Sequence, residues 1–195
     1  SASIYLTLDC KFPNNYQIKI SLGYCLFKLN YLDKAENIFN KVLSENFERL
    51  DNIDIYCMIC LENKNLRSIV NLASTQYSKN NLKQENIFIL FAYYYNLKEY
   101  KIAIKYLERA LKLNPRNLIY RIYLGKCYEK MSNPTVAFGI YNSTVLEDNI
   151  FFEGYFNLGR LYNLEKLYKY SNFYLLEALS LNKSKHLDIK ILQIM

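Results

Sequence analysis

The stretch LIYRIYLGKCYEKMSNPTVAFGIYNSTVLEDNIF, residues 118–151, decides the fold, because several of its residues recur along the chain at one fixed interval. Its Leu-Gly-x-x-Tyr motif at residues 124–128 returns at residues 158–162, an offset of 34. The same register is kept by Leu22 and Gly23, by Ala35, Ala103 and Ala137, by Ala110 and Ala178, and by Pro13 and Pro115. The chain is therefore built from repeats with this period.

Each recurring residue type has a physical role in a pair of packed helices. Gly and Ala let two helices cross closely, so Gly125→Leu should overpack such a crossing. Large rings fill the space between helix pairs, and Pro stops a helix from continuing. The rings in these positions are Phe39, Tyr128, Tyr141 and Tyr162. A period of 34 with this pattern is typical of the tetratricopeptide repeat. We therefore predict an all-α fold, a right-handed superhelical solenoid of antiparallel helix pairs.

The register divides the chain into repeats. The predicted ranges are 1–15 for the end of a preceding repeat, 16–49, a degenerate repeat at 50–83, 84–117, 118–151, 152–185, and 186–195 for the start of a further repeat. The predicted helices lie near 16–30, 32–46, 51–63, 65–79, 84–96, 99–113, 118–131, 134–147, 152–164 and 167–181. Ile189 and Leu192 should form an inward pair in the last partial repeat. We expect the chain to be a fragment of a longer array, because neither end carries a polar capping repeat.

Composition and charge exclude several classes of protein. Hydrophobic residues make up 51% of the chain, which is enough for a core, but no segment is long and apolar enough to span a membrane. The formal net charge is +7, and the Lys residues are scattered, so we expect solvated helix faces and no nucleic-acid partner. Five unevenly spaced Cys and no visible signal peptide favour an intracellular, reducing compartment.

The sequence offers little material for catalysis. It has a single His, His186, and no Gly-rich loop of the kind that binds phosphate. Cys57 and Cys60 form a C-x-x-C pair, but the repeat register puts both on an inward helical face, where buried structural thiols are expected. We therefore predict that the chain is not an enzyme and has neither a cofactor nor a metal site.

Tetratricopeptide arrays bind peptides on the concave face, which the first helix of each repeat lines, and side chains there recur every three or four residues. The predicted groove residues are Phe88, Tyr95, Ile122, Lys126, Glu129, Glu153, Phe156, Arg160 and Asn163. Glu129 is the main candidate, since a carboxylate binds an Arg guanidinium and an aromatic ring can stack on it. Two alternatives remain open. The apolar members could simply pack the array, and Glu129 could pair with Arg160 to hold adjacent repeats together.

Part of the chain resembles one family in particular. The segments are LDNIDIYCMICLENKNLRSIVNLA at residues 50–73, YYYNLKEYKIAIKYLERALKLNPRN at residues 93–117 and KFPNNYQIKISLGYCL at residues 11–26. They are similar to the anaphase-promoting complex subunit called cell division cycle protein twenty-three, or subunit eight, and the resemblance covers roughly residues 11–182.

The resemblance implies a non-catalytic scaffold in a ubiquitin ligase that controls cell-cycle progression in the nucleus and cytoplasm. The implied partners are other tetratricopeptide subunits, an Arg-containing coactivator peptide, and a second copy bound through repeats outside these residues. The alternative is a tetratricopeptide interaction module of another assembly, such as a glycosyltransferase arm or an RNA-processing complex.

Overall fold

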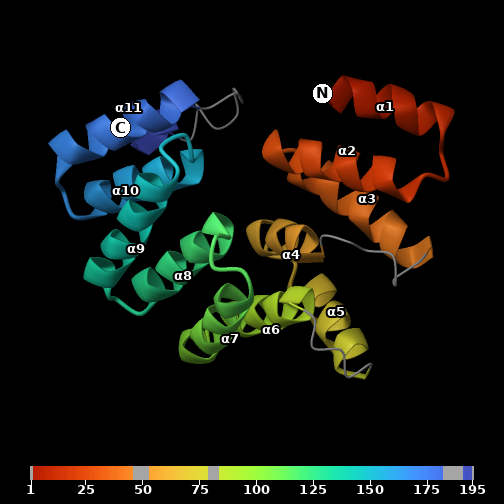
Figure 1. Cartoon of the computed structure of the whole chain (residues 1–195), viewed down its shortest axis with the longest axis horizontal. Coiled ribbons are helices and arrows are strands. Elements are labelled where there is room, and N and C mark those ends of the chain that lie inside the picture. Colours follow the sequence, from red (N-terminus) through yellow and green to blue (C-terminus); the bar gives the residue numbers. More distant parts are fainter. Residues whose placement is uncertain (1, 46–52, 79–83, 182–190, 195) are drawn as a thin grey trace. The chain divides into compact units, whose positions relative to one another are not determined.

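The computed structural model describes residues 2–45, 53–78, 84–181 and 191–194, and in these ranges the regular secondary structure is entirely α-helical (Figure 1). The chain divides into two compact units, residues 1–97 and 98–195. The first unit contains α1 (Ala2–Lys11), α2 (Tyr16–Lys28), α3 (Leu32–Glu45), α4 (Ile53–Glu62), α5 (Leu66–Ser78) and α6 (Gln84–Asn96). The second contains α7 (Tyr100–Leu113), α8 (Leu118–Lys130), α9 (Pro134–Glu147), α10 (Phe152–Leu164) and α11 (Tyr168–Leu181).

The prediction of paired helices is confirmed. From α2 to α11, every helix begins and ends within two residues of its predicted range. Within each unit, consecutive helices pack as hairpins, and the first helix of one pair also packs on the next, as α4 does on α6 and α8 on α10. The exact limits of the individual repeats remain a prediction.

The turn inside each helix pair shows the repeat period most clearly. The non-glycine residues with a positive φ in the described ranges are Asn30, Lys64, Lys98, Ser132 and Lys166, which follow one another at the same interval as the sequence motif. In the turn after α2, the Asn30 N–H donates to the Phe27 carbonyl at 2.9 Å, and the Tyr31 N–H donates to the Leu26 carbonyl at 2.9 Å. The same two bonds close the turns after α4, α8 and α10. This is the Schellman motif, whose left-handed residue is usually Gly. The degenerate repeat therefore keeps the turn geometry of the others.

The helix starts are fixed by short polar side chains. The Asn15 and Asn117 side chains accept hydrogen bonds from the backbone N–H three residues later, at 3.2 Å in both cases, and so cap α2 and α8. Asn133 caps α9 in the same way, with Pro134 in the first turn, where its missing N–H costs little. The capping residue of α9 is therefore Asn133, and the preceding Ser132 is the left-handed residue of the turn.

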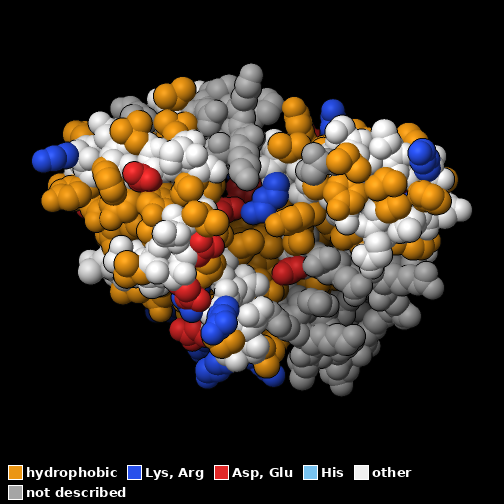
Figure 2. Space-filling view, turned by 45° about the horizontal axis from the view of Figure 1, so that its top comes forward, with side chains coloured by type: hydrophobic (Ala, Val, Ile, Leu, Met, Phe, Trp, Pro, Cys, Tyr) orange, Lys and Arg blue, Asp and Glu red, His pale blue; other side chains and the backbone are white. Residues whose placement is uncertain are grey.

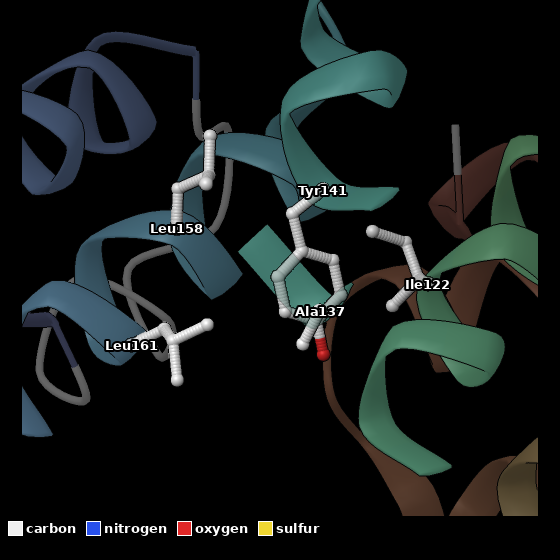
Figure 3. Close-up of a cluster of buried hydrophobic side chains, with 5 residues drawn as sticks. All are labelled: Ile122, Ala137, Tyr141, Leu158 and Leu161. Carbon is white, nitrogen blue, oxygen red and sulfur yellow. The ribbon is translucent and has the colours of Figure 1, made fainter. Parts of the chain in front are cut away.

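The recurring glycines lie where the two helices of a pair cross. A Cβ atom added at any of three of them would come within 2.7 Å of a side-chain atom on the second helix. The neighbours are Phe39 for Gly23, Tyr141 for Gly125 and Leu175 for Gly159. Tyr141 is fully buried, and its ring lies between Ile122 of α8 and Leu158 and Leu161 of α10 (Figure 3). The predicted roles of Gly and of the large ring are therefore confirmed at this crossing.

Outside the degenerate repeat, two positions depart from the repeat pattern and are still buried. Phe91 stands where three other repeats carry Gly23, Gly125 and Gly159, and the centroid of its ring lies 4.9 Å from that of Phe88. Ser171 stands in place of the usual Ala, and its hydroxyl donates to the Gly159 carbonyl at 2.9 Å. The hydroxyl is thus satisfied, so this substitution does not leave an unpaired polar group in the core.

Candidate functional site

The predicted groove residues come from first helices in both units. Phe88 and Tyr95 belong to α6 in the first unit. Phe88 is fully buried, so its side chain packs the core and is not presented to a ligand. Tyr95 is half-buried, with its ring 5.6 Å from that of Phe91. The assignment of Phe88 to a binding surface is therefore corrected.

Ile122, also predicted to line the groove, is likewise a core residue. It is only 3% exposed and lies in the core cluster formed with Ala137, Tyr141, Leu158 and Leu161 (Figure 3). The first helix of a repeat packs its own second helix on one flank and the next repeat on another. Spacing of three or four residues places side chains on a common stripe but does not show which flank that stripe covers. The open alternative, that the apolar members pack the array, therefore holds for both Phe88 and Ile122.

Glu129 lies at the centre of a polar network between adjacent repeats. Its two carboxylate oxygens accept hydrogen bonds from the Arg160 guanidinium, at 2.6 and 2.7 Å. One of these oxygens also accepts a hydrogen bond from the Tyr141 hydroxyl. The Glu129 side chain is 12% exposed and that of Arg160 is 29% exposed. The alternative that Glu129 holds two repeats together is therefore the arrangement observed.

The charge state of this pair follows from its surroundings. Burial alone would lower the pKa of Arg160, but the hydrogen bond from its guanidinium to Glu129 and the carboxylate charge outweigh that effect and raise it. Arg160 is thus a fixed cation on α10, and Glu129 positions it. One guanidinium nitrogen, Nη2, donates to both carboxylate oxygens, and this charge-assisted contact joins α8 to α10.

The remaining predicted residues of α8 and α10 keep part of their surface accessible. Lys126 is half-buried, and its Nζ lies 4.6 Å from the centroid of the Tyr123 ring, a cation–π distance. Phe156 is half-buried and stacks on Phe152 with centroids 5.8 Å apart. Glu153, one helical turn before Asn157, is also half-buried. Phe156, at the repeat position of Phe88 and Ile122, also packs against the core cluster of Leu175, Ala178 and Ile191.

Asn163 has a structural partner. Its side-chain amide donates to the Ile194 carbonyl at 2.7 Å, which ties α10 to the helical turn at residues 191–194. In this turn Ile191 is buried, whereas Leu192 is 62% exposed, so the predicted inward role of Leu192 is wrong. Ile189, its predicted partner, lies outside the described residues, as does His186.

A buried carboxylate that the sequence reasoning missed joins the first two repeats. Glu36 on α3 is 8% exposed and accepts a hydrogen bond from the Asn63 amide at 2.6 Å and another from the Asn65 amide. Both Asn residues belong to the turn after α4. A Glu followed by two Asn 27 and 29 residues later carries no distinctive pattern in the sequence, so only the fold reveals this contact.

The cysteines predicted to be structural are buried. Cys57 and Cys60 are both fully buried on α4, and Cys127 is fully buried on α8. Burial raises the pKa of Cys60 to about 12, with a further contribution from the charge of Glu36, and burial raises that of Cys127 to about 12 as well. These thiols stay protonated at neutral pH, which makes them poor nucleophiles.

The described part of the chain has neither a cluster of metal-binding side chains nor a helix that could span a membrane. No group of three or more His, Cys, Asp or Glu side chains within it has an arrangement that could hold a metal ion. None of its helices has both the length and the apolar character needed to cross a bilayer.

Helix hairpins that recur at a fixed period, cross at small residues and are joined by polar contacts between repeats form a helical-repeat architecture. The sequence model of the tetratricopeptide repeat matches residues 16–49 and 92–117. A solved tetratricopeptide repeat protein from Parabacteroides merdae superposes with a TM-score of 0.73 at 15% identity, covering 99% of this chain and 75% of that one. The chain therefore has the fold of tetratricopeptide-repeat proteins.

Two relatives with the same name point to a particular group of helical-repeat proteins. Anaphase-promoting complex subunit 8 of Dictyostelium discoideum is 31% identical over 111 residues, which are 57% of this chain and 19% of the relative. The subunit of the same name from Arabidopsis thaliana is 25% identical over 120 residues, or 62% of this chain and 21% of the relative. The chain thus spans about a fifth of the length of both. The crystal structure of the APC/C hetero-tetramer Cut9–Hcn1 matches with a TM-score of 0.75 at 14% identity, covering 85% of this chain and 32% of that one.

Proposed function

We propose that this chain is part of a non-catalytic scaffold subunit of the anaphase-promoting complex, of the subunit 8 type, which binds neighbouring subunits and a coactivator peptide. The observation that carries the proposal is the similarity to subunit 8 of two distantly related organisms, over more than half of this chain in each case. A helical-repeat fold is well suited to such a role, because it presents an extended surface built from many first helices.

The contacts between repeats support a rigid scaffold. Charge-assisted hydrogen bonds among Glu129, Arg160 and Tyr141 link α8, α9 and α10. The side chains of Glu129 and Arg160 are largely buried. Glu36 makes a comparable link between α3 and the turn after α4. Directional contacts of this type resist sliding of one repeat over the next, which keeps a binding surface preformed.

The proposed peptide site consists of the partly accessible apolar and charged side chains of α8 and α10. Glu153 and Phe156 lie three residues apart on α10 and therefore on the same side of the helix. A carboxylate and an aromatic ring placed in this way can bind one Arg side chain together. Lys126 and the fixed cation Arg160 offer donors to backbone carbonyls or to acidic groups of the peptide. Glu129 acts by positioning Arg160.

The membership is tested by purifying the tagged full-length protein from its own cells and identifying co-purifying proteins by mass spectrometry. We expect the other subunits of the ligase at near-stoichiometric levels, with an unrelated tagged tetratricopeptide protein as the control. Recovery of a glycosyltransferase or of RNA-processing factors in their place would reject the ligase assignment and support the alternative.

The peptide site is tested by fluorescence anisotropy with a labelled Arg-containing coactivator peptide and the same peptide with Arg replaced by Ala. Glu153→Gln should weaken binding of the Arg peptide by about 10- to 100-fold, the loss expected for a hydrogen bond to a charged group. Glu108→Gln is the matched control, because Glu108 is an exposed acid on α7, a second helix. Equal affinity of the Glu153→Gln and Glu108→Gln variants would exclude Glu153 from the site.

A further inference from the structure

The exposed side of α7 carries a row of cations. Lys101, Lys105, Arg109 and Lys112 follow one another at intervals of four, four and three residues, and all of these side chains are exposed. They form no run of like charge in the sequence, but spacings of three and four residues place them on one stripe of a helix. We refer to these residues as the α7 basic stripe. At a rise of 1.5 Å per residue, the stripe is about 16 Å long.

The packing of the repeat does not require these charges. The opposite side of α7 is formed by Ala103, Leu107 and Ala110, which are fully buried. Within the part of the chain that the structure describes, no residue of the α7 basic stripe makes an ion pair. Consecutive cations four residues apart, as at 101, 105 and 109, repel each other and destabilise a helix. The stripe therefore lowers the stability of α7 without a compensating contact among the described residues.

The repeat register provides an internal comparison. At the corresponding positions, α3, α5 and α11 each carry one cation and α9 carries none; the cations are Lys41, Arg67 and Lys169. Residues 98–116, which include α7 and the turns beside it, have six Lys and Arg against two Glu, a net charge of +4 out of +7 for the whole chain. Over the face that Figure 2 shows, Lys and Arg side chains lie mostly singly among hydrophobic and uncharged groups. The row of cations is thus a feature of α7 that the repeat architecture does not need.

We propose that the α7 basic stripe binds an extended acidic segment of a partner protein, rich in Asp and Glu. Charge complementarity is the basis of this contact. Successive cations of the stripe are about 4.5–6 Å apart along the helix axis, and alternate side chains of an extended segment are about 6.6 Å apart. Long Lys and Arg side chains can therefore reach successive carboxylates of one such segment. This surface lies on a second helix, separate from the proposed peptide site on α8 and α10, and it does not depend on the proposed ligase membership.

An acidic protein segment fits this surface better than nucleic acid or lipid does. Proteins bind single-stranded nucleic acid where aromatic rings stack on the bases, but the rings of α7, Tyr100 and Tyr106, are half-buried. A helix that lies on a membrane presents its hydrophobic side to the lipid, whereas the hydrophobic side of α7 is buried in the repeat. The α7 basic stripe thus offers charges for carboxylates but neither of these additional features.

The test is fluorescence anisotropy of a labelled oligoglutamate peptide with the 195-residue chain. We expect binding that weakens as salt is added, since the charges on both sides are exposed to solvent. The variant K101Q/K105Q/R109Q/K112Q should weaken binding about tenfold or more, because several surface ion pairs are lost together. Its melting temperature should stay the same or rise, because the repulsion along α7 is removed. Unchanged affinity of this variant overturns the proposal.

The matched control is K41Q/R67Q/K130Q/K169Q, which also removes three Lys and one Arg from exposed positions but leaves the α7 basic stripe intact. It should bind the peptide nearly as well as the unmodified chain does. An equal loss of affinity in the two variants would show that only the overall charge matters, and would overturn the proposal. So would tighter binding of oligothymidylate, or of vesicles containing phosphatidylserine, at the same salt concentration. No ligase subunit enters this experiment, so its result is separate from that of the co-purification.

Discussion

Two Gly→Ala substitutions with opposite expected effects test the packing of the repeats most directly. Gly125 lies in α8 at the crossing with α9, and a Cβ atom there would lie 2.7 Å from Cζ of the Tyr141 ring. Gly139 lies inside α9, and a Cβ atom there would meet nothing within 4 Å. Both positions are helical, so both substitutions gain the same helix propensity, about 0.8–1 kcal/mol.

The difference between the two variants isolates the steric effect. Gly139→Ala should stabilise the protein by about 0.5–1 kcal/mol, since no contact opposes the gain in propensity. At Gly125 the Tyr141 ring must move, but it is fully buried and its hydroxyl is bound to Glu129, so it has little freedom to do so. Overpacking of this kind costs about 1–3 kcal/mol. Gly125→Ala should therefore be less stable than Gly139→Ala by that amount, and Gly125→Leu should be less stable still.

The comparison is made by thermal and chemical unfolding followed by circular dichroism in the far ultraviolet. For a chain of this size, about 1 kcal/mol corresponds to a shift of about 2–4 °C in the melting temperature. Adding Tyr141→Leu to Gly125→Ala should recover part of the steric loss, because it removes the ring that the new methyl group meets. Equal stability of the two single Ala variants would refute the close crossing, and with it the register on which the repeats are assigned.

Three further predictions concern the polar network, the turns and the buried thiols. Glu129→Lys should lower the free energy of unfolding, measured in urea, by about 1–3 kcal/mol, because it leaves Arg160 without its acceptor. Unchanged stability would contradict a structural role for Glu129 and favour its role as a ligand contact. Lys64→Gly and Lys166→Gly should each raise stability by about 0.5–1 kcal/mol, since their positive φ disfavours a side chain, and a loss in either thermal melt would contradict this. Burial on folding raises the pKa of Cys127 from its ordinary value of 9.0 to about 12, so the unfolded chain loses this proton at lower pH than the folded one. Stability should therefore fall between about pH 9 and pH 12. Cys127→Ala should make this fall in melting temperature with pH shallower, and an identical pH dependence would show that the thiol does not contribute.

The repeat period made most of the fold predictable. Small residues, rings and prolines at a fixed interval determine which segments are helices and where two helices must cross, because only small residues fit at a crossing. The helix ends followed to within two residues, and the buried cysteines followed from the same register. Residue identity did not indicate the left-handed turns, since the Lys at positions 64, 98 and 166 has no preference for positive φ.

The candidate site was less predictable, for a geometric reason. Sequence spacing placed Phe88, Ile122 and Glu129 on one stripe of their helices but could not tell whether neighbouring helices covered it. The structure buries the first two and joins Glu129 to Arg160 and Tyr141. Sequence by itself therefore determined the local architecture, because helix periodicity and close crossings are short-range properties of a single repeat unit. Which polar side chains face solvent and which hold the repeats together was decided only by tertiary structure, because it depends on contacts between residues that lie about one repeat apart.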